Sequence, residues 1–325
     1  MSNVVTIFGG SGFIGRYIAS KMAKQGWRVR VAVRRPNEAL FVRTYGDVGQ
    51  VEPILANIRN DESVRAAIVG ADVVINCVGI LLEDGRQKFD TIHADGAERI
   101  AKISSSEDVK RLIHISAIGA NLESESKSAR SKAAGEECVI NAFPDAVILR
   151  PSIVFGAEDS FFNRFSSMSR FSPLLPLIGA ETLFQPVYVG DVAQAALAAS
   201  YGSVSGGIYE LGGPDKETFR SLMKRMLLVV RRKNIIINTP IWIAKLIAFG
   251  FDVLQITTFG IFKNFIITRD QVKQLNVDNV VSDQYGSFED FNIVPQSMAA
   301  ILETYLYRYR PYGQYTSIHE SADNS

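Results

Sequence analysis

The chain is poor in the residues that build metal centres and disulfide frameworks. It has two cysteines, Cys77 and Cys138, which show neither metal-ligand spacing nor the number that a disulfide framework needs. Both are expected to be small buried side chains in a reducing compartment. No group of histidine, cysteine and carboxylate residues in the sequence has the spacing of metal ligands, so no metal is predicted.

The chain also lacks an excess of charge of one sign. The formal net charge is +1, and acidic and basic residues are mixed along the sequence. Such a chain has no general electrostatic attraction to nucleic acid, which is therefore not an expected partner. Internal repeats and low-complexity segments are lacking too, so a repeat architecture is not expected.

A leader segment is not visible before the first predicted strand. Residues 1–3 are too few for a signal peptide or an organellar presequence. The expectation is a protein that is made and used in one compartment, most simply a bacterial cytoplasm. A length of 325 residues with 47% hydrophobic content allows one large α/β domain and a smaller lobe.

Short apolar runs alternate with helical patterns through residues 1–150. This alternation predicts an α/β fold in which a Rossmann-type doubly wound parallel sheet carries helices on both faces. The predicted strands are residues 4–8, 28–33, 51–55, 72–77, 112–115 and 146–149, and the predicted helices include 62–69, 94–104 and 131–141.

Residues 151–325 have a different texture, with more prolines and aromatic side chains. They are expected to form a smaller C-terminal lobe that packs on the cofactor domain and closes over the cofactor. Helices are predicted at residues 191–200 and 218–231. The polar tail, about residues 312–325, is expected to be flexible.

One stretch of this lobe, about residues 235–267, is strongly apolar. Asp252 lies in its middle and Lys245 and Lys263 interrupt it, which argues against a membrane-spanning helix. Two interpretations remain open. The stretch is either buried in the lobe, or it is an exposed surface that docks on a partner or touches a bilayer.

The sequence VVTIFGGSGFIGR, residues 4–16, joins a β-branched strand to a helix through a glycine-rich turn. Its three spaced glycines match a variant of the dinucleotide-binding fingerprint, in which they allow a tight turn, a close approach to the pyrophosphate, and close packing of helix on strand. The pyrophosphate then lies on free N–H groups at the positive end of the helix. The cofactor contacts expected here are Gly9, Gly12, Phe13, Ile14, Gly15 and Arg16.

The end of the second predicted strand favours NADP(H) over NAD(H). It carries Arg34 and Arg35, with no carboxylate before Glu38, and Arg16 is expected to point toward the same phosphate. The alternative is that these arginines form an ordinary solvated strand end. Residues at the next two strand ends are expected to line the adenine and nicotinamide-ribose regions, namely Asn57, Ile58, Cys77, Val78 and Gly79.

Four motifs resemble the extended and atypical short-chain dehydrogenase/reductase superfamily: GGSGFIG at residues 9–15, NCVG at 76–79, HISAIGA at 114–120 and RPSIVFG at 150–156. The second half is similar to a narrower family, the short-chain-dehydrogenase-like accessory subunits of respiratory complex I. That similarity is carried by QPVYVGDVA at residues 185–193, YELGGP at 209–214, TRDQVKQL at 268–275, DNVVSD at 278–283 and YLYRYRPYGQY at 305–315.

The resemblance to the superfamily implies a Tyr-x-x-x-Lys pair on one helix, in which the lysine lowers the pKa of the tyrosine that exchanges a proton with substrate. Here Lys132 is present, but Ser128 occupies the tyrosine position. Ser116 is near the position of the assisting serine, although the register favours Ala117 there. Lys132 is still expected to hold the nicotinamide ribose, or else to be a solvated helix lysine. Pro151 completes the expected cofactor contacts. His114 is expected to be a packed or hydrogen-bonded structural residue, and His93 a cap or loop residue before a helix.

The resemblance and the missing tyrosine together predict a non-catalytic NADPH-binding accessory subunit that supports assembly and stability of the peripheral arm of complex I. Its partners would be other subunits of that complex, with peripheral lipid contact, on the cytoplasmic face of a bacterial inner membrane. Two alternatives remain: a free NADPH-dependent reductase or epimerase that uses Lys132 and another proton donor, and a soluble NADPH sensor.

Overall fold

The computed structural model describes residues 3–240, 269–275 and 277–315. The chain divides into two compact units. The first unit comprises Met1–Ser152, Val189–Gly212 and Val281–Pro295, and the second comprises Ile153–Tyr188, Gly213–Val280 and Gln296–Ser325. The chain first passes from the first unit to the second after Ser152, close to the expected boundary after residue 150. Two segments of the second half of the chain, Val189–Gly212 and Val281–Pro295, nevertheless belong to the first unit. Both contribute to its sheet or cover it.

The first unit is built on a parallel sheet that has seven strands in the described part of the chain. The strand order is β11-β6-β5-β4-β1-β2-β3, and every neighbouring pair is parallel. The strands are β1 (Val4–Phe8), β2 (Arg28–Val33), β3 (Val51–Leu55), β4 (Val73–Asn76), β5 (Arg111–Ile115), β6 (Val147–Pro151) and β11 (Gly207–Leu211). Every residue of β4 and of β6 is buried, as expected for strands covered on both faces.

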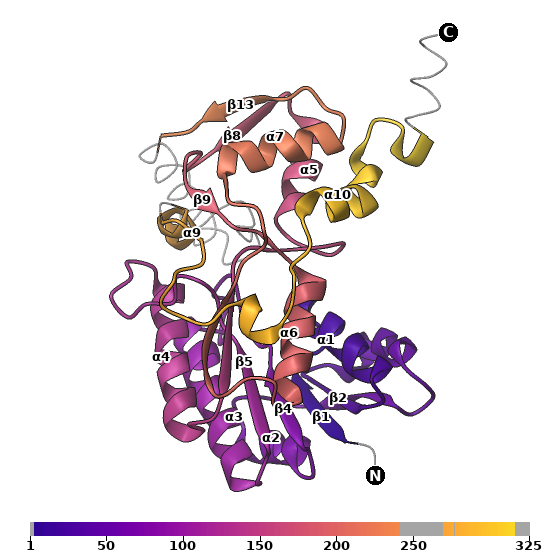
Figure 1. The fold of residues 1–325 in the computed structure, drawn as a ribbon, viewed down its shortest axis with the longest axis vertical. Helices are drawn as coiled ribbons and strands as arrows, with labels where there is room; N and C mark the ends of the chain where they lie inside the picture. Colours follow the sequence, from indigo (N-terminus) through magenta and orange to yellow (C-terminus); the bar gives the residue numbers. More distant parts are fainter. Residues whose placement is uncertain (1–2, 241–268, 276, 316–325) are drawn as a thin grey trace. The chain divides into compact units, whose positions relative to one another are not determined.

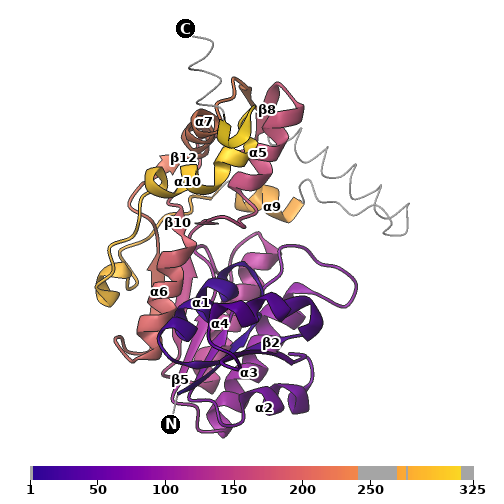
Figure 2. The same cartoon turned by 90° about the vertical axis from the view of Figure 1, so that its right-hand side faces the viewer.

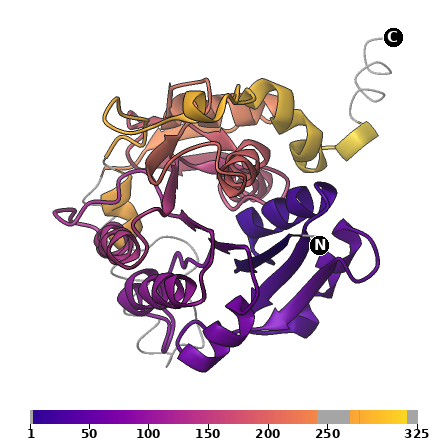
Figure 3. The ribbon, with the colours of Figure 1, turned by 60° about the horizontal axis from the view of Figure 1, so that its bottom comes forward.

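Helices cover both faces of this sheet. On one face of the sheet, α1 (Phe13–Lys24) packs against α6 (Val189–Ser200). On the other face, three helices pack in a row: α2 (Asp61–Ile68), α3 (Asp95–Ser106) and α4 (Lys127–Ala142) (Figure 1). In Figure 3 the indigo helix and the magenta helices lie on opposite sides of the strands. The predicted Rossmann-type doubly wound architecture is confirmed.

Local capping fixes where several helices begin. The side chain of Asn60 accepts a hydrogen bond from the N–H of Ser63 at 2.7 Å and starts α2. Ser126 caps α4 in the same way, from the N–H of Ala129 at 3.2 Å. The helix expected at 131–141 therefore begins four residues earlier. Sequence reasoning missed the 3₁₀ segment η1 (Pro36–Tyr45) and the π turn η2 (Asp90–Ala94) that leads into α3.

The outermost strand, β11, was also missed. It is five residues long and lies between glycine pairs, so its pairing with β6 has no local signal. The returning segment 281–295 covers this edge of the sheet, and it contains the 3₁₀ turn η3 (Phe288–Phe291). The backbone N–H of Glu210 donates to Gly286, and the N–H of Gly286 donates to Ile208.

The second unit is a smaller assembly of helices and short strands (Figure 2). Its core is rich in aromatic side chains. Phe155, Phe162, Phe184 and Phe219 are buried in it. Its helices are α5 (Phe162–Phe171), α7 (Phe219–Val229), α9 (Arg269–Gln274) and α10 (Met298–Leu306), followed by η4 (Tyr307–Tyr309) and η5 (Gly313–Tyr315). Its short strands are β7 (Val154–Phe155), β8 (Leu174–Leu177), β9 (Leu183–Phe184), β10 (Val187–Tyr188), β12 (Glu217–Thr218) and β13 (Ile235–Asn238). The phenol of Tyr305 donates to Asp159 at 2.6 Å and ties α10 to the start of α5.

Only the beginning of the predicted apolar stretch is described. Its first residues form β13, which pairs in parallel with β8, and residues 241–267 lie outside the described part of the chain. The same holds for the end of the predicted tail, residues 316–325. Among the described residues, no helix combines the length and apolar character that crossing a bilayer requires.

Candidate nucleotide-binding site

The glycine turn after β1 has the geometry of a dinucleotide-binding loop. Gly9 has a φ of +71°, and a Cβ at this position would lie 3.1 Å from the carbonyl oxygen of Cys77. A Cβ at Gly15 would lie 2.7 Å from the Cα of Gly10 and collide with the carbonyl oxygen of Gly9. The loop is therefore pressed against β4 on one side and α1 on the other, and no larger side chain fits at Gly15.

The first turn of α1 is open to an anion. Its N-cap is Gly12, no side chain caps it, and its first turn holds no acidic residue. The first N–H groups of a helix have no intrahelical partner and lie at the positive end of its dipole. A pyrophosphate is the chemistry that such an end accepts.

A pocket of about 670 Å³ lies beside this turn, at the carboxyl ends of β1 to β4. Ligands of open parallel sheets bind at this edge. The structure brings the following predicted residues together around the pocket: Gly9, Gly12, Arg34, Arg35, Asn57, Ile58, Cys77, Val78 and Gly79. Burial raises the pKa of the Cys77 thiol to about 12, so this wall carries a neutral thiol.

Other predicted residues do not line this pocket, namely Phe13, Ile14, Gly15, Arg16, Lys132 and Pro151. The Arg16 guanidinium donates to the carbonyl oxygen of Ser11 at 3.1 Å and lies 5.0 Å from the ring centre of Phe41. The guanidinium thus lies between its own loop and η1. Gly15 contributes through helix packing, as described above.

Sequence reasoning missed several residues of the pocket wall: Ser11, Glu38, Arg59, Ile80, Gln87 and Ile92. Ser11 could have been found, because it lies inside the glycine turn. Gln87 comes from the loop after β4, whose Asp84–Gln87 bridge gives no signal in the sequence.

The two arginines at the end of β2 differ in their surroundings. Arg35 forms an ion pair with Glu38 at 3.0 Å, and both side chains are largely exposed. Arg34 makes no hydrogen bond or ion pair with any residue in the described ranges. Arg34 could therefore bind a phosphate without losing an existing contact, whereas Arg35 would have to give up its ion pair with Glu38.

Two buried hydroxyls lie where the resemblance directs attention: Ser128, at the position expected for the catalytic tyrosine, and Ser116, near the position expected for the assisting serine. Ser128 is 7% exposed and Ser116 is 6% exposed. The Ser116 hydroxyl donates to the carboxylate of Glu136, and the Ser131 hydroxyl donates to the carbonyl oxygen of Ser128 at 2.9 Å. A serine hydroxyl is a far weaker acid than a phenol, so this site lacks the usual proton donor.

Lys132 is half-buried on α4 and interacts electrostatically with Glu136, His93 and His114. Burial lowers the pKa of its ammonium, and the charge of Glu136 opposes that shift. No residue in the described part of the chain hydrogen-bonds to the Lys132 ammonium.

The two buried histidines are packed and hydrogen-bonded. His93 Nε2 accepts from the N–H of Ile80 at 3.1 Å, while its Nδ1 lies 2.9 Å from the hydroxyl of Ser131. His114 Nδ1 lies 3.0 Å from the amide nitrogen of Asn76. Burial, with the Lys132 charge as the second cause, lowers the pKa of His93 to about 3 and that of His114 to about 4.

This predicts a specific loss of stability in mild acid. Both folded-state pKa values lie below the ordinary 6.5, so the unfolded chain takes up protons that the folded protein does not. The stability that the neutral imidazoles contribute is full above about pH 6.5 and is lost as the pH falls toward 4 and then 3. Urea unfolding should show a fall of roughly 2–4 kcal/mol between pH 7.5 and 5. NMR titration should find both rings neutral at pH 5, and Lys132→Met should raise both imidazole pKa values. Rings that titrate near pH 6.5 would contradict the prediction.

Among the described residues, no group of three or more histidine, cysteine or carboxylate side chains could hold a metal ion.

Known proteins resemble the chain in both sequence and fold. A family model described as NAD(P)H-binding matches residues 9–158. The chain is 37% identical over 316 residues to the NADH dehydrogenase (ubiquinone) 1 alpha subcomplex subunit 9, mitochondrial, of Arabidopsis thaliana, with 95% of this chain and 79% of the relative covered. It is 30% identical over 239 residues to the ceramide reductase of Caulobacter vibrioides, with 73% of this chain and 74% of the relative covered.

A solved structure extends the likeness to the whole fold. The dTDP-glucose 4,6-dehydratase of Bacillus anthracis, in complex with NAD, matches with a TM-score of 0.72 at 14% identity, covering 95% of this chain and 96% of that one. The resemblance to the short-chain-dehydrogenase-like accessory subunits of complex I is confirmed by the Arabidopsis relative. The chain carries an NAD(P)H-binding domain and belongs to the family of the NADH dehydrogenase (ubiquinone) 1 alpha subcomplex subunit 9.

Proposed function

We propose that this protein is an accessory subunit of respiratory complex I that binds NADP(H) as a structural ligand. The observation that carries the proposal is the combination of a pocket beside the glycine turn, at the carboxyl ends of β1 to β4, with a buried Ser128 at the place expected for the catalytic tyrosine. The 37% identity to a complex I subunit over 95% of the chain supports the choice of partner.

The charges at the end of β2 favour the phosphorylated cofactor. Arg34 and Arg35 both line the pocket, and a guanidinium fork suits a 2′-phosphate. Glu38 also lines the pocket, where a carboxylate would favour the ribose hydroxyls of NAD(H), but its pairing with Arg35 occupies it. Lys132 would hold the nicotinamide ribose, which requires no proton transfer.

A nucleotide that is held without turnover stabilises the fold it binds. A ligand bound only by the folded state adds about 2.7 kcal/mol of stability at a hundredfold excess over its Kd. In this proposal the bound nucleotide braces the first unit, and the subunit in turn supports assembly and stability of the peripheral arm.

We place the subunit peripherally on the cytoplasmic face of a bacterial inner membrane, with lipid contact through the second unit. The β8–β13 ribbon supports that contact. Leu174, Ile235 and Ile237 are exposed on it, and Phe171, just before β8, is 83% exposed. Exposed apolar side chains gathered in this way are typical of a surface that meets a partner or a bilayer.

The test is a detergent extract of native membranes resolved by blue-native electrophoresis and probed for this chain. We expect the chain to migrate with NADH dehydrogenase activity and to release about one NADPH per chain, identified by mass spectrometry. Recovery of the chain only in the soluble fraction, or without nucleotide, would overturn the proposal.

A second candidate function is an NADPH-dependent reductase. It is favoured by the 30% identity to a ceramide reductase and by the retained Lys132. Such an enzyme would need a proton donor other than Ser128. NADPH oxidation by the purified protein in the presence of a carbonyl substrate, abolished by Lys132→Met, would establish this function in place of the first.

A further inference from the structure

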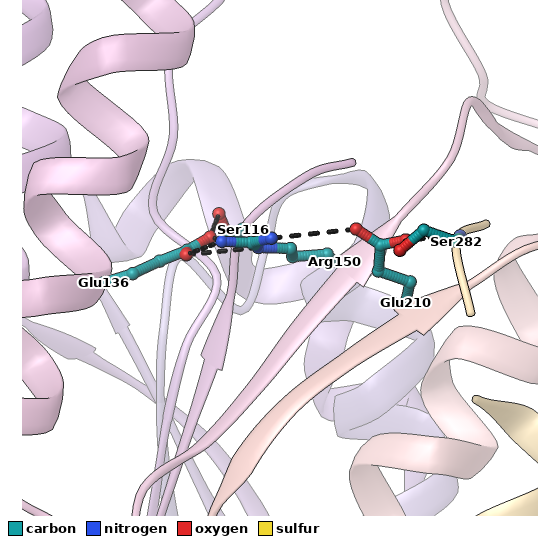
Figure 4. Close-up of polar contacts among 5 residues, drawn as sticks. All are labelled: Ser116, Glu136, Arg150, Glu210 and Ser282. Atoms are coloured by element: carbon teal, nitrogen blue, oxygen red, sulfur yellow. Dashed lines mark hydrogen bonds and ion pairs between the residues drawn. The ribbon is translucent and has the colours of Figure 1, made fainter. Parts of the chain in front are cut away.

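A chain of buried charged side chains crosses the first unit (Figure 4). Glu136 of α4, Arg150 of β6 and Glu210 of β11 are 2%, 6% and 4% exposed. Arg150 grips Glu136 with two nitrogens, Nε to Oε1 at 3.0 Å and Nη2 to Oε2 at 2.5 Å. Its Nη1 lies 3.7 Å from Glu210, whose carboxylate accepts from the N–H of Ser282 at 2.8 Å.

Glu136 is held on a second side as well. The Ser116 hydroxyl at the end of β5 donates to Glu136 Oε1, the oxygen that also accepts from Arg150 Nε. The carboxylate is thus fixed between two strands and cannot rotate freely. Figure 4 shows Ser116 and Arg150 both directed at it.

Glu136 follows Lys132 by one helical turn, so the two side chains share a face of α4. The signs of charge then alternate from one side chain to the next: Lys132 is positive, Glu136 negative, Arg150 positive and Glu210 negative. The other titratable groups that face Lys132 are His93 from η2 and His114 from β5, and both are neutral. In the described part of the chain, Glu136 is therefore the carboxylate that favours the charged form of Lys132.

Lys132 is linked to the wall of the nucleotide pocket through His93. It interacts electrostatically with His93, whose Nε2 accepts from the N–H of Ile80, a pocket residue. The same Nε2 would lie 3.8 Å from a Cβ at Gly79, another pocket residue. Lys132 thus acts electrostatically on a histidine that contacts the residues after β4, where the nicotinamide half of the nucleotide is expected.

Stability alone does not explain why the charges are buried. Replacing a buried ion pair by apolar side chains of similar volume is often neutral or stabilising. We propose that Glu136 is a positioning residue for the nucleotide: held by Arg150 and Ser116, it orients the Lys132 ammonium, one helical turn away on α4, toward the nicotinamide end of the site. This inference rests on the proposed function, in which Lys132 contacts the nicotinamide ribose.

The test compares two ligands on the full-length protein. NADPH spans the site, whereas adenosine 2′,5′-bisphosphate occupies only the adenine half. Glu136→Gln is expected to weaken NADPH binding about tenfold, and to leave the affinity for the bisphosphate unchanged. The loss should grow with rising pH, because the ammonium loses its proton more easily without its carboxylate. Calorimetric titration at several pH values measures both effects.

Two control variants separate positioning from general damage. Glu210→Gln removes an equally buried carboxylate beside Arg150, and Glu98→Gln removes the carboxylate of an exposed Glu98–Lys102 pair. Neither should change the ratio of the two affinities. Ser116→Ala, which keeps both charges, is the milder variant if Glu136→Gln does not fold. It should give a selective loss of NADPH affinity of about threefold.

The outcomes are distinct. Equal losses for both ligands, the same selective loss in Glu210→Gln, or unchanged NADPH affinity in both Glu136→Gln and Ser116→Ala would each overturn the positioning role and leave the proposed function standing. A wild-type protein that binds neither ligand would overturn both.

Discussion

An Arg150→Met variant is expected to lose about 3–5 kcal/mol of unfolding free energy. Arg150 lies between the buried carboxylates of Glu136 and Glu210, and Tyr285 stacks on its guanidinium at 4.7 Å. Burial alone would lower the pKa of the guanidinium, but the hydrogen bonds and charge of Glu136, with Tyr285, outweigh it and raise the pKa. Without the Arg150 cation, the carboxylates of Glu136 and Glu210 remain buried but lose their ion pairs. Burying an unpaired carboxylate costs free energy, because the group has lost its hydration. Urea unfolding of the nucleotide-free protein at neutral pH measures the loss.

The matched control is a surface ion pair of the same residue types. Arg43 and Glu52 are ion-paired at the outer edge of the sheet, and both side chains are about half exposed. Arg43→Met should therefore cost no more than about 1 kcal/mol. If Arg150→Met costs as little as Arg43→Met, the buried ion pairs of Arg150 with Glu136 and Glu210 contribute nothing measurable to stability, and the prediction is wrong.

Replacing both Arg34 and Arg35 by alanine is expected to weaken NADPH binding about 10–100-fold and to leave NADH binding nearly unchanged. The 2′-phosphate is the one group that distinguishes the two cofactors, and these guanidinium groups line the pocket at the end of β2. Arg34→Ala alone should account for most of the loss, because Arg35 is already paired with Glu38. Fluorescence titration with each cofactor gives the two dissociation constants.

Removing the negative charge of Glu38 should strengthen NADPH binding, in contrast to removing the two arginines. Glu38→Gln releases Arg35 from its ion pair and removes a negative charge from the pocket wall. We expect NADPH to bind a few times more tightly to this variant and NADH to gain nothing. Equal weakening of both cofactors by the two arginine substitutions would refute the 2′-phosphate assignment.

The first unit was largely predictable because its signals are local. The apolar run at residues 4–8 and the glycines after it define a strand, a turn and a helix within a short span, and the structure places all three there. The five further predicted strands lie within two residues of their expected ends, because each is a buried apolar run bounded by turn residues.

The contacts that sequence reasoning missed are those that join residues far apart in the sequence. The contact of Arg16 with Phe41 was not foreseen, because Phe41 belongs to a 3₁₀ segment that no local pattern indicated. Glu136 and Arg150 are a helix residue and a strand residue in the sequence, and only the pairing of β5 with β6 beneath α4 brings them together. Glu210 and Ser282 meet across an even longer separation, through the edge strand β11.

The returning segments also set an order of events during synthesis. A domain ordinarily folds once its own residues have emerged from the ribosome, which adds about 5–20 residues per second to the chain. Here the sheet receives its outer strand and the helix beside α1 from Val189–Gly212, and its last covering segment from Val281–Pro295. Most of the chain must therefore leave the ribosome before the nucleotide unit is whole. A nascent chain that stalls before this point exposes the edge of β6 and the buried charges beside it, which makes the unfinished subunit a natural substrate for chaperones and proteases.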